Sequence, residues 1–302
     1  MADRTRTWDG VAGRRVVITG ATAGIGLAAA EELARRGAEL AIVARSPERA
    51  SAARERIAHV AGGGGVDVLL ADLASQAAIR RLAAEILERY PRLDVLVNNA
   101  GAINAKHLLT GDGIELTWAV NHLAPFLLTT LLVDRLRASV PARVITTASD
   151  AHSGARIPFE ELDSGRDDGR GFRRYAQTKL ANILFTAELA RRLDGTGVTA
   201  NCHHPGFVAS NLGRNYGLRM RVAMAIARPF VRSNQRGADT LVWVADSPEV
   251  GDQSGRYFVD RRIGRPSREA QDPGVARRLW ELSERQVAGS APPTLRNGER
   301  VQ

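Results

Sequence analysis

The stretch RVVITGATAGIG, residues 15–26, runs from a short apolar segment into three closely spaced glycines, and a helical pattern begins at once. Glycine is needed where a turn takes unusual dihedral angles or where backbone approaches a pyrophosphate, and a helix N-terminus offers free N–H donors. The spacing differs from the usual dinucleotide fingerprint, so a purely structural glycine turn stays open as the alternative. We expect the phosphates of a dinucleotide to be bound by Gly20, Thr22, Gly24, Ile25 and Gly26.

Beyond this stretch, short runs rich in β-branched residues alternate with longer segments of helical periodicity, which is the pattern of a parallel sheet. Strands are predicted at Arg15–Thr19, Glu39–Ala44, Val66–Ala71, Val95–Asn98, Arg143–Thr147, Val198–His203 and Gly255–Val259. Helices are predicted at Gly24–Arg36, Pro47–Val60, Gln76–Tyr90, Gly113–Ser139, Tyr175–Leu193, Arg236–Ala245 and Pro273–Arg285. The sequence therefore predicts an α/β fold, a single-domain, Rossmann-like, doubly wound parallel sheet of about seven strands with helices on both faces.

Three parts of the chain are expected to differ in role. Residues 1–14 are predicted to be an N-terminal extension, residues 15–287 the dinucleotide-binding domain, and residues 288–302 a mobile tail. Within the domain, residues 206–234 leave the strand–helix rhythm and mix Leu and Met with arginines, which favours a mobile lid over an apolar ligand. A surface helix with a core face is the alternative, and contact of this segment with a membrane surface is left open.

The composition excludes several classes of partner. The net charge is +9 and the pI is about 10.7, but the arginines are scattered and no basic stripe is interleaved with aromatic residues, so nucleic acid is not expected. No apolar run approaches the ~20 residues that span a bilayer, and residues 1–15 lack the apolar core of a signal peptide, so a cytoplasmic location is expected. No metal is expected, because the run Cys202-His203-His204 lies on a strand whose neighbouring side chains point to opposite faces.

The end of the second predicted strand bears on the choice of cofactor. It reads Ala44-Arg45-Ser46, where a reader of the ribose 2′-hydroxyl would be Asp or Glu. The guanidinium of Arg45 can instead pair with a 2′-phosphate. NADP(H) is therefore expected in preference to NAD(H), with a solvated surface arginine as the alternative.

Tyr175 and Lys179 form the candidate proton-transfer pair. Among the 42 basic residues only Lys106 and Lys179 are lysine, in a chain that otherwise uses arginine. Residues at i and i+4 share a helix face, and a neighbouring ammonium lowers the pKa of a phenol. The pair could then exchange a proton with a substrate oxygen, although an isolated Tyr-x-x-x-Lys is also compatible with a surface helix.

Taken in order along the chain, these motifs resemble the short-chain dehydrogenase/reductase family. The matching elements are the glycine pattern of residues 19–26, Asp72-Leu73, Asn98-Asn99-Ala100-Gly101, Ser149, Tyr175 with Lys179, and Pro205-Gly206. The closer resemblance is to the retinol dehydrogenase and WW-domain-containing oxidoreductase branch. It rests on Val120-Asn121-His122-Leu123, on the long insert between Ser149 and Tyr175, and on residues 179–185 and 254–258.

The resemblance implies a role for each matching residue. Ser149 would hydrogen-bond the substrate oxygen, Tyr175 would give or take its proton, and Lys179 would hold the nicotinamide ribose while lowering the tyrosine pKa. Asn121 would interrupt its helix and hold a water that links Lys179 to solvent. Further contacts to the cofactor would come from Asp72, Leu73, Asn99, Ala100, Gly101, Pro205, Gly206 and Val208.

The resemblance implies an NADP(H)-dependent oxidoreductase that transfers a hydride between the nicotinamide and a carbonyl or alcohol of a small, apolar substrate. Tyr175 would be its general acid and base. Reduction of an activated C=C or C=N bond on the same scaffold is one alternative, and a non-catalytic NADP-binding regulatory protein is another. Assembly into a homodimer or higher homo-oligomer is left open.

Overall fold

The computed structural model describes residues 7–62, 65–164, 170–207 and 232–288. Over these residues one sheet has the strand order β3-β2-β1-β4-β5-β6-β7-β8. Its strands are β1 (Arg15–Thr19), β2 (Glu39–Ala44), β3 (Val66–Leu70), β4 (Val95–Asn98), β5 (Ala142–Thr147), β6 (Val198–His204), β7 (Tyr257–Val259) and β8 (Arg262–Ile263). All neighbours pair in parallel except β7 and β8. The predicted fold class is confirmed, and β8 is a strand that the sequence analysis missed.

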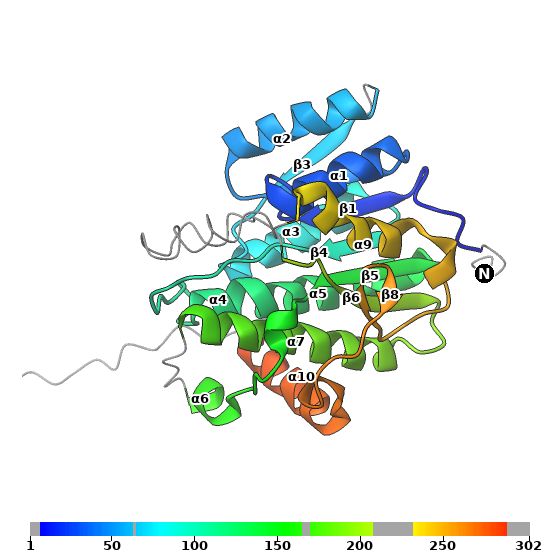
Figure 1. Cartoon of the computed structure of the whole chain (residues 1–302). Helices are drawn as coiled ribbons and strands as arrows, with labels where there is room; N and C mark the ends of the chain where they lie inside the picture. The colour runs from blue at the N-terminus through cyan, green and yellow to red at the C-terminus, as the bar shows by residue number, and fades with distance from the viewer. Residues whose placement is uncertain (1–6, 63–64, 165–169, 208–231, 289–302) are drawn as a thin grey trace, which may run out of the picture.

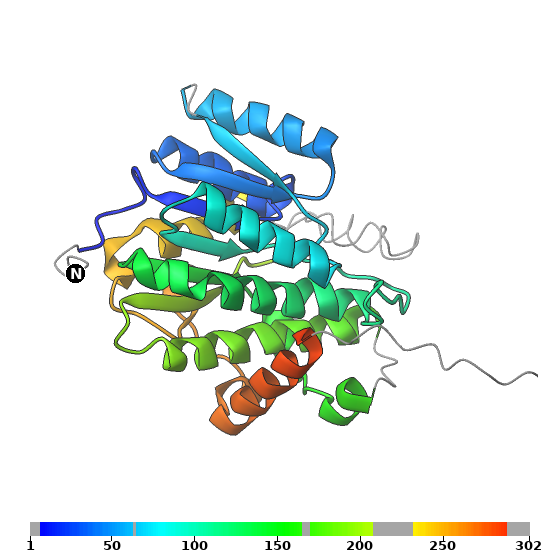
Figure 2. The same cartoon turned by 180° about the vertical axis from the view of Figure 1, so that it is seen from behind.

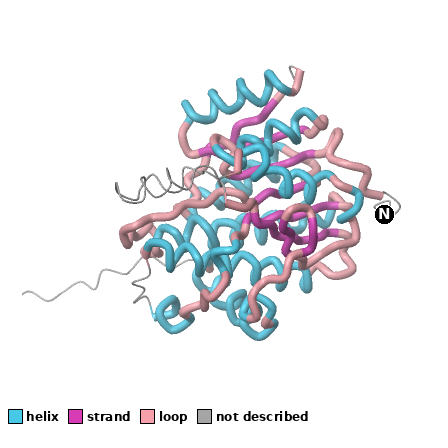
Figure 3. Tube along the Cα trace, viewed as in Figure 1, coloured by secondary structure: helices cyan, strands magenta, loops and turns pink. Residues whose placement is uncertain are grey.

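Helices connect the strands and cover the sheet, as the tube in Figure 3 shows. They are α1 (Gly24–Arg35), α2 (Pro47–Val60), α3 (Gln76–Arg89), α4 (Leu116–Trp118), α5 (Ala124–Ala138), α6 (Phe159–Ser164), α7 (Gly171–Arg192), α9 (Asn234–Asp246) and α10 (Pro273–Val287). A π-helical turn, η1, covers Ala119–Leu123, and single 3₁₀ turns are η2 (Asp150–His152), η5 (Pro248–Val250) and η6 (Glu269–Gln271).

Alternation along the strands assigns each side chain to one of two cores. In β1, Val17 belongs to the core cluster that includes residues of α3, α5, α7 and α10, whereas Val16 and Ile18 belong to the cluster that includes residues of α1, α2 and α9. Figure 1 shows α1 beside α9, and Figure 2, from behind, shows α3 and α5 side by side with α7 in the same layer. Both faces are covered, which explains why the strands are apolar almost throughout.

The strand order reverses between β1 and β4. From β1 the chain builds outward through β2 and β3, and from β4 it builds outward on the other side through β5 and β6. In open parallel sheets a crevice forms at such a reversal, at the carboxyl ends of the strands. This topology therefore places Thr19, Asn98 and Thr147 at the edge where a ligand would bind.

The helix predicted over Gly113–Ser139 is present as one continuous helical stretch from Leu116 to Ala138, but it contains a π-helical turn that was not predicted. α4 is a single short turn, η1 inserts a π-helical turn, and α5 begins only at Ala124. The carboxylate of Glu115 accepts N–H hydrogen bonds from Thr117 (2.9 Å) and Trp118 (2.8 Å), which fixes the start. The apolar pattern did not reveal the π turn because residues 121–129 are buried on nearly every side.

Among the residues that the structure describes, one helical stretch is long and apolar enough to cross a bilayer by length and composition alone. It runs from Leu116 to Ala138, 23 residues with a mean hydropathy of 1.5, so the expectation that no stretch approaches this length was too strict. Within its most apolar window, 72% is buried inside the protein. It therefore has the character of a core helix in the layer that packs under the sheet.

Residues 8–14 pack against the amino-terminal edge of the sheet. Trp8 is only 8% exposed and Val11 is fully buried. The indole of Trp8 lies between two guanidinium groups, 4.2 Å from that of Arg14 and 3.9 Å from that of Arg143, and its Nε1 donates to the carbonyl oxygen of Asp246 at 2.8 Å. The boundary predicted at residue 14 stays a prediction, but this segment contributes to the core.

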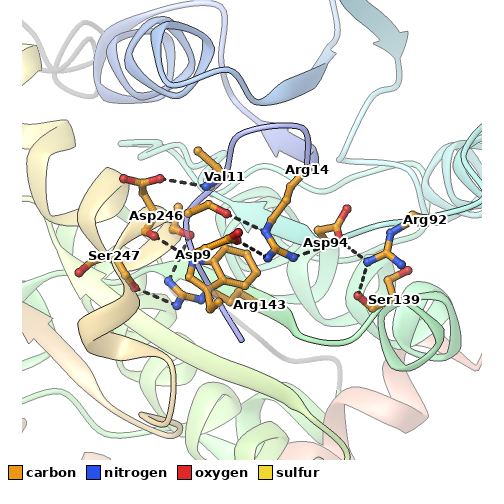
Figure 4. Close-up of polar contacts among 12 residues, drawn as sticks. Asp9, Val11, Arg14, Arg92, Asp94, Ser139, Arg143, Asp246 and Ser247 are labelled. Carbon is orange, nitrogen blue, oxygen red and sulfur yellow. Dashed lines mark hydrogen bonds and ion pairs between the residues drawn. The ribbon is translucent and has the colours of Figure 1, made fainter. Parts of the chain in front are cut away.

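Arg143 links this segment to the end of α9. Its guanidinium donates to the carbonyl oxygens of Val244 (2.7 Å), Ala245 (3.2 Å) and Ser247 (2.9 Å). Figure 4 shows the hydrogen bonds from Arg143 to Ser247 and from Arg14 to Asp9. Burial lowers the pKa of Arg143 to about 9, so these carbonyl partners compensate a costly buried cation.

The packing of Trp8 predicts its contribution to stability. Trp8→Ala should lower the free energy of unfolding by roughly 3 to 5 kcal/mol, because it leaves a cavity beside two buried guanidinium groups. Trp8→Phe is the matched control, since it keeps the ring between the arginines and loses only the Nε1 hydrogen bond. Urea unfolding followed by circular dichroism measures both. A Trp8→Ala protein as stable as the wild type would show that this segment does not contribute to the core.

Candidate active site

A cleft of about 720 Å³ opens at the carboxyl ends of the strands. It extends from the glycine turn after β1, past the ends of β2 and β3, to α7. The structure brings most of the predicted site residues together in its lining: Gly20, Thr22, Gly24, Ile25, Gly26, Arg45, Asp72, Leu73, Asn99, Ala100, Gly101, Tyr175, Lys179 and Pro205. Residues as far apart in the sequence as Gly20 and Pro205 therefore meet in one continuous site.

Close backbone approach explains two of the glycines. Gly20 has φ of +71°, and a Cβ there would lie 2.7 Å from the Cα of Ala100. A Cβ on Gly26 would lie 2.3 Å from the carbonyl oxygen of Gly20 and 2.3 Å from the side-chain nitrogen of Asn99. A larger residue at either position would push the turn after β1 away from the end of β4.

The start of α1 lacks a side-chain cap. Its N-cap residue, Ala23, makes no side-chain hydrogen bond, whereas the hydroxyls of Ser46 and Ser75 cap α2 and α3. The first-turn N–H groups of α1 have no partner within their own helix, and together with the helix dipole they favour an anion. The glycine turn thus presents these donors to the cleft.

Asn99 joins the ends of three strands. Its Nδ2 donates to the carbonyl oxygens of Thr19 (3.1 Å) and Gly20 (3.3 Å), and its Oδ1 accepts from the hydroxyl of Thr147 (3.3 Å). The backbone N–H of Asn99 in turn donates to the hydroxyl of Thr19 at 3.0 Å. The side chain of Asn99 is therefore engaged in holding the floor of the cleft together.

Arg45 lies exposed where β2 meets α2, as expected, and it lines the cleft. Two further lining residues of this corner, Ser46 and the exposed Arg49, were not predicted. Arg49 lies in the first turn of α2, and its backbone N–H donates to Ser46 Oγ at 3.2 Å. Because the chain is rich in arginine, the position of Arg49 in the sequence alone did not mark it as a cofactor-binding residue.

Lys179 is buried at the inner end of the cleft. Its Nζ donates to the carbonyl oxygen of Thr147 at 2.9 Å, and Asn182 Nδ2 donates to the same oxygen at 3.1 Å. Burial lowers the pKa of Lys179 to about 8. The prediction that this lysine is chemically distinct agrees with its surroundings, since only 3% of it is exposed.

Tyr175 and Ser149 are hydrogen-bonded to each other at the same end of the cleft. Lys179 Nζ lies 5.4 Å from the centroid of the Tyr175 ring. Burial raises the pKa of Tyr175, and the hydrogen bond from Ser149 lowers it but does not compensate. The expectation that the tyrosine pKa is depressed by the ammonium is therefore not met in this state, because desolvation of the phenolate outweighs its partners.

Asn121 lies in the π-helical turn η1, so the expected interruption of its helix is present. Its Oδ1 accepts the N–H of Ala102 at 2.7 Å, and its Nδ2 donates to the carbonyl oxygen of Ala102 (2.8 Å) and to Thr178 Oγ1 (3.1 Å). A Cβ on Gly101 would lie 3.5 Å from Asn121 Oδ1 and 3.7 Å from Lys179 Nζ. Asn121 thus lies near the ammonium, and the water expected between them stays a prediction.

Gly206 and Val208 are the remaining predicted cofactor contacts. Gly206 has φ of +79° and follows the lining residue Pro205. Val208 and most of the predicted lid, residues 208–231, lie outside the described residues, as does most of the predicted tail. The roles assigned to them stay predictions.

The run Cys202-His203-His204 has protein partners. Cys202 Sγ donates to the carbonyl oxygen of Arg256 at 3.6 Å, His203 Nε2 lies 3.0 Å from Thr147 Oγ1, and His204 Nε2 lies 3.1 Å from Asp150 Oδ2. Across the part of the chain that the structure describes, no group of three or more His, Cys, Asp or Glu side chains could hold a metal ion.

Comparison with known proteins agrees with this geometry. The family model described as short chain dehydrogenase matches residues 14–220. Retinol dehydrogenase 14 of Mus musculus is 42% identical over 290 residues, covering 90% of this chain and 85% of its own length. Retinol dehydrogenase 13 of Homo sapiens is 41% identical over 287 residues, covering 93% and 87%. The resemblance to the retinol dehydrogenase branch is confirmed.

A solved structure extends the likeness to the fold. The short chain dehydrogenase from Burkholderia cenocepacia, in complex with NADP, has a TM-score of 0.65 and 30% identity. The likeness covers 82% of this chain and 96% of that chain. The match therefore includes most of the sheet and the helices that carry the cleft.

The buried ammonium predicts a pH dependence of stability. In the unfolded chain Lys179 keeps its proton up to about pH 10.5, whereas in the folded chain its pKa is about 8. Between these values the unfolded state binds more protons, so the wild type gains stability from this group as the pH rises. Lys179→Met should be more stable than the wild type near pH 7, and this advantage should shrink by roughly 3 kcal/mol by pH 10.5.

Urea unfolding at a series of pH values measures this difference. Lys106→Met is the matched control, since Lys106 is the other lysine and is exposed. Comparing variant with wild type cancels the titration of the tyrosines and of Cys202. A difference that stays constant from pH 7 to pH 10.5 would contradict the lowered pKa of Lys179.

Proposed function

The chain belongs to the short-chain dehydrogenase family, and on that premise we propose that it is an NADP(H)-dependent oxidoreductase acting on a carbonyl or alcohol. One observation carries the proposal. Tyr175, hydrogen-bonded to Ser149 and with Lys179 Nζ over its ring, lies at the end of the same cleft that begins at the glycine turn. A proton donor and an anion-binding turn thus share one site of dinucleotide size.

The residues present fit a dinucleotide. The uncapped start of α1 offers N–H donors to a pyrophosphate, and the glycine turn leaves room for its close approach. Asp72 and Leu73 would lie beside the adenine, and Lys179 would hold the nicotinamide ribose. When bound, the nicotinamide would supply or accept the hydride. The Burkholderia cenocepacia relative, solved with NADP, supports this assignment.

The corner at the end of β2 supports NADP(H) over NAD(H). Arg45 and Arg49 are both exposed there, with Ser46 between them, and all three line the cleft. A guanidinium recognises a phosphate through two parallel hydrogen bonds, whereas a ribose 2′-hydroxyl is usually read by a carboxylate. Two cations and a hydroxyl therefore suit a 2′-phosphate.

The hydrogen bonds of Ser149 explain how the substrate oxygen would be held. Ser149 Oγ accepts the N–H of Ala151 at 3.2 Å, which leaves its own O–H free to donate. Its side chain is hydrogen-bonded with that of Tyr175, and a substrate oxygen entering between the two hydroxyls would accept from both. Tyr175, with its pKa raised by burial, holds its proton until an alkoxide forms to take it.

Lys179 can then exchange a proton near neutral pH. Burial lowers its pKa to about 8, and its ammonium lies on the face of the Tyr175 ring. A phenolate left after proton transfer would be stabilised by this charge. Asn121, which like Lys179 lies close to Gly101, would hold a water that links the lysine to solvent.

The apolar character of the substrate is part of the proposal. The lining of the cleft includes Ile103, Leu116 and Val120. The ring of Phe172, 61% exposed, lies 6.1 Å from that of Tyr175. The relatives named retinol dehydrogenases support an apolar alcohol or aldehyde. A cytoplasmic location stays a prediction of the sequence, and assembly into homo-oligomers stays open.

The first test is turnover by the purified protein. Mixed with NADPH and a panel of apolar aldehydes and ketones, it should consume the reduced cofactor, followed by its absorbance. Consumption only with enones or imines would favour reduction of a C=C or C=N bond. NADPH binding without turnover of any compound would favour the non-catalytic alternative.

Replacing the proposed proton donor should abolish turnover. Tyr175→Phe should lower kcat at least about 100-fold, the range of general acid catalysis, while NADPH still binds. Tyr90→Phe is the matched control, because Tyr90 lies at the end of α3, donates to Asp67 and does not line the cleft. A Tyr175→Phe protein with near wild-type kcat would remove Tyr175 from the mechanism.

Reversing the charge at the end of β2 should change cofactor preference. Arg45→Asp should raise the Michaelis constant for NADPH by about 10- to 100-fold, the loss of a charge-assisted hydrogen bond, with little effect on that for NADH. Arg54→Asp, exposed on α2 and outside the lining, controls for net charge. Equal effects of Arg45→Asp on both cofactors would show that Arg45 does not contact the 2′-phosphate.

A further inference from the structure

The backbone of Ser149 is held by the turn that follows it. Ser149 has extended backbone angles, φ −168° and ψ 152°, and forms the N-cap of η2. Its carbonyl oxygen accepts the N–H of His152 at 3.1 Å, and its hydroxyl accepts the N–H of Ala151. The direction of the serine hydroxyl toward Tyr175 thus depends on the geometry of four consecutive residues.

The side chain of His152 makes a second hydrogen bond to that same carbonyl oxygen. His152 Nδ1 lies 2.7 Å from Ser149 O, and His152 Nε2 lies 3.1 Å from the backbone N–H of Ser267. The carbonyl can only accept and the N–H can only donate, so the ring must be the neutral tautomer with its proton on Nδ1. His152 is 2% exposed, which isolates both hydrogen bonds from water.

We propose that His152 is a positioning residue that holds Ser149 in the orientation needed to hydrogen-bond the substrate oxygen. This inference rests on the proposed function, in which Ser149 contacts that oxygen. The imidazole bridges the serine turn to the segment between β8 and η6, so it ties Ser149 to backbone more than 100 residues away in sequence. Ser149 is then fixed by the folded protein and not by its own turn alone.

The surroundings of His152 restrict its ring to this orientation. The ring of Tyr257 packs edge-on against it, with centroids 5.4 Å apart. The hydroxyl of Tyr257 donates to Asp150 Oδ1 at 2.5 Å, and His204 Nδ1 accepts the backbone N–H of Asp150 at 3.2 Å. Asp150 is therefore held from the side of β6 and β7, whereas the Ser149 carbonyl receives its side-chain hydrogen bond from His152.

Two substitutions separate the two ends of the imidazole. His152→Asn places an amide nitrogen where Nδ1 lies, so it keeps the donor to Ser149 O and loses the contact to Ser267. His152→Gln places an amide oxygen where Nε2 lies, so it keeps an acceptor for Ser267 N–H and loses the donor to Ser149 O. His152→Leu also lacks that donor and serves if His152→Gln does not fold. His59→Gln, on an exposed position of α2, controls for loss of a histidine.

We expect His152→Gln to lower kcat roughly 10- to 100-fold, the cost of misplacing a catalytic group by about 1 Å, with the Michaelis constant for NADPH little changed. His152→Asn should keep most of the wild-type kcat. In a Ser149→Ala background, His152→Gln should have little further effect, because a positioning residue acts only through the group that it positions. His152→Gln with wild-type kcat, or with the same fold loss in both backgrounds, would overturn the proposal.

Crystal structures of the variants provide a readout that needs no substrate. The Ser149 hydroxyl should move away from Tyr175 in His152→Gln and stay in place in His152→Asn. If the wild type turns over no compound in the panel, the proposed function fails, and these structures still decide whether His152 positions Ser149. An unmoved serine in His152→Gln would overturn the inference even in an active enzyme.

Discussion

The buried hydrogen bond from Lys179 Nζ to the carbonyl oxygen of Thr147 fixes where α7 crosses the end of the sheet. Thr147 is the last residue of β5, and its carbonyl oxygen also accepts from Asn182 Nδ2, so two side chains of α7 are tied to the end of this strand. Burying an ammonium costs free energy of folding because it loses its hydration. This buried ammonium lies where the cleft reaches Tyr175. One turn of α7 therefore determines both the position of the Tyr175 phenol and its electrostatic environment.

The order of strands and helices could be predicted because the central strands are apolar and buried on both faces and most connections contain glycine or proline. The hairpin between β7 and β8 could not. Its two loop residues, Asp260 and Arg261, have φ of 50° and 59°, which two-residue hairpin turns require and for which Gly and Asn are the usual residues. Ion pairs from Arg232 to Asp260 and from Arg261 to Asp239 accompany this turn. Each pair joins residues more than 20 positions apart, so the local sequence does not indicate it.

At the candidate site, residues that belong to a sequence motif could be predicted. Residues whose role depends on contacts between distant segments could not. Tyr175 and Lys179 follow from their spacing and from the scarcity of lysine. Thr147, which accepts from Lys179 and holds Asn99, has no pattern that marks it before the strands are assembled. The pKa of Tyr175 was expected to fall and instead rises, because desolvation depends on burial that a sequence does not show.

The most direct test of the account is a crystal structure of the protein with NADP(H) bound. We predict that the dinucleotide occupies the cleft, with its pyrophosphate at the start of α1, its 2′-phosphate beside Arg45, and its nicotinamide ribose within hydrogen-bond distance of Lys179 Nζ. The nicotinamide ring should then lie next to the Tyr175 hydroxyl. A dinucleotide bound elsewhere, or one whose nicotinamide lies away from Tyr175 while Lys179 contacts only Thr147, would contradict the proposed chemistry.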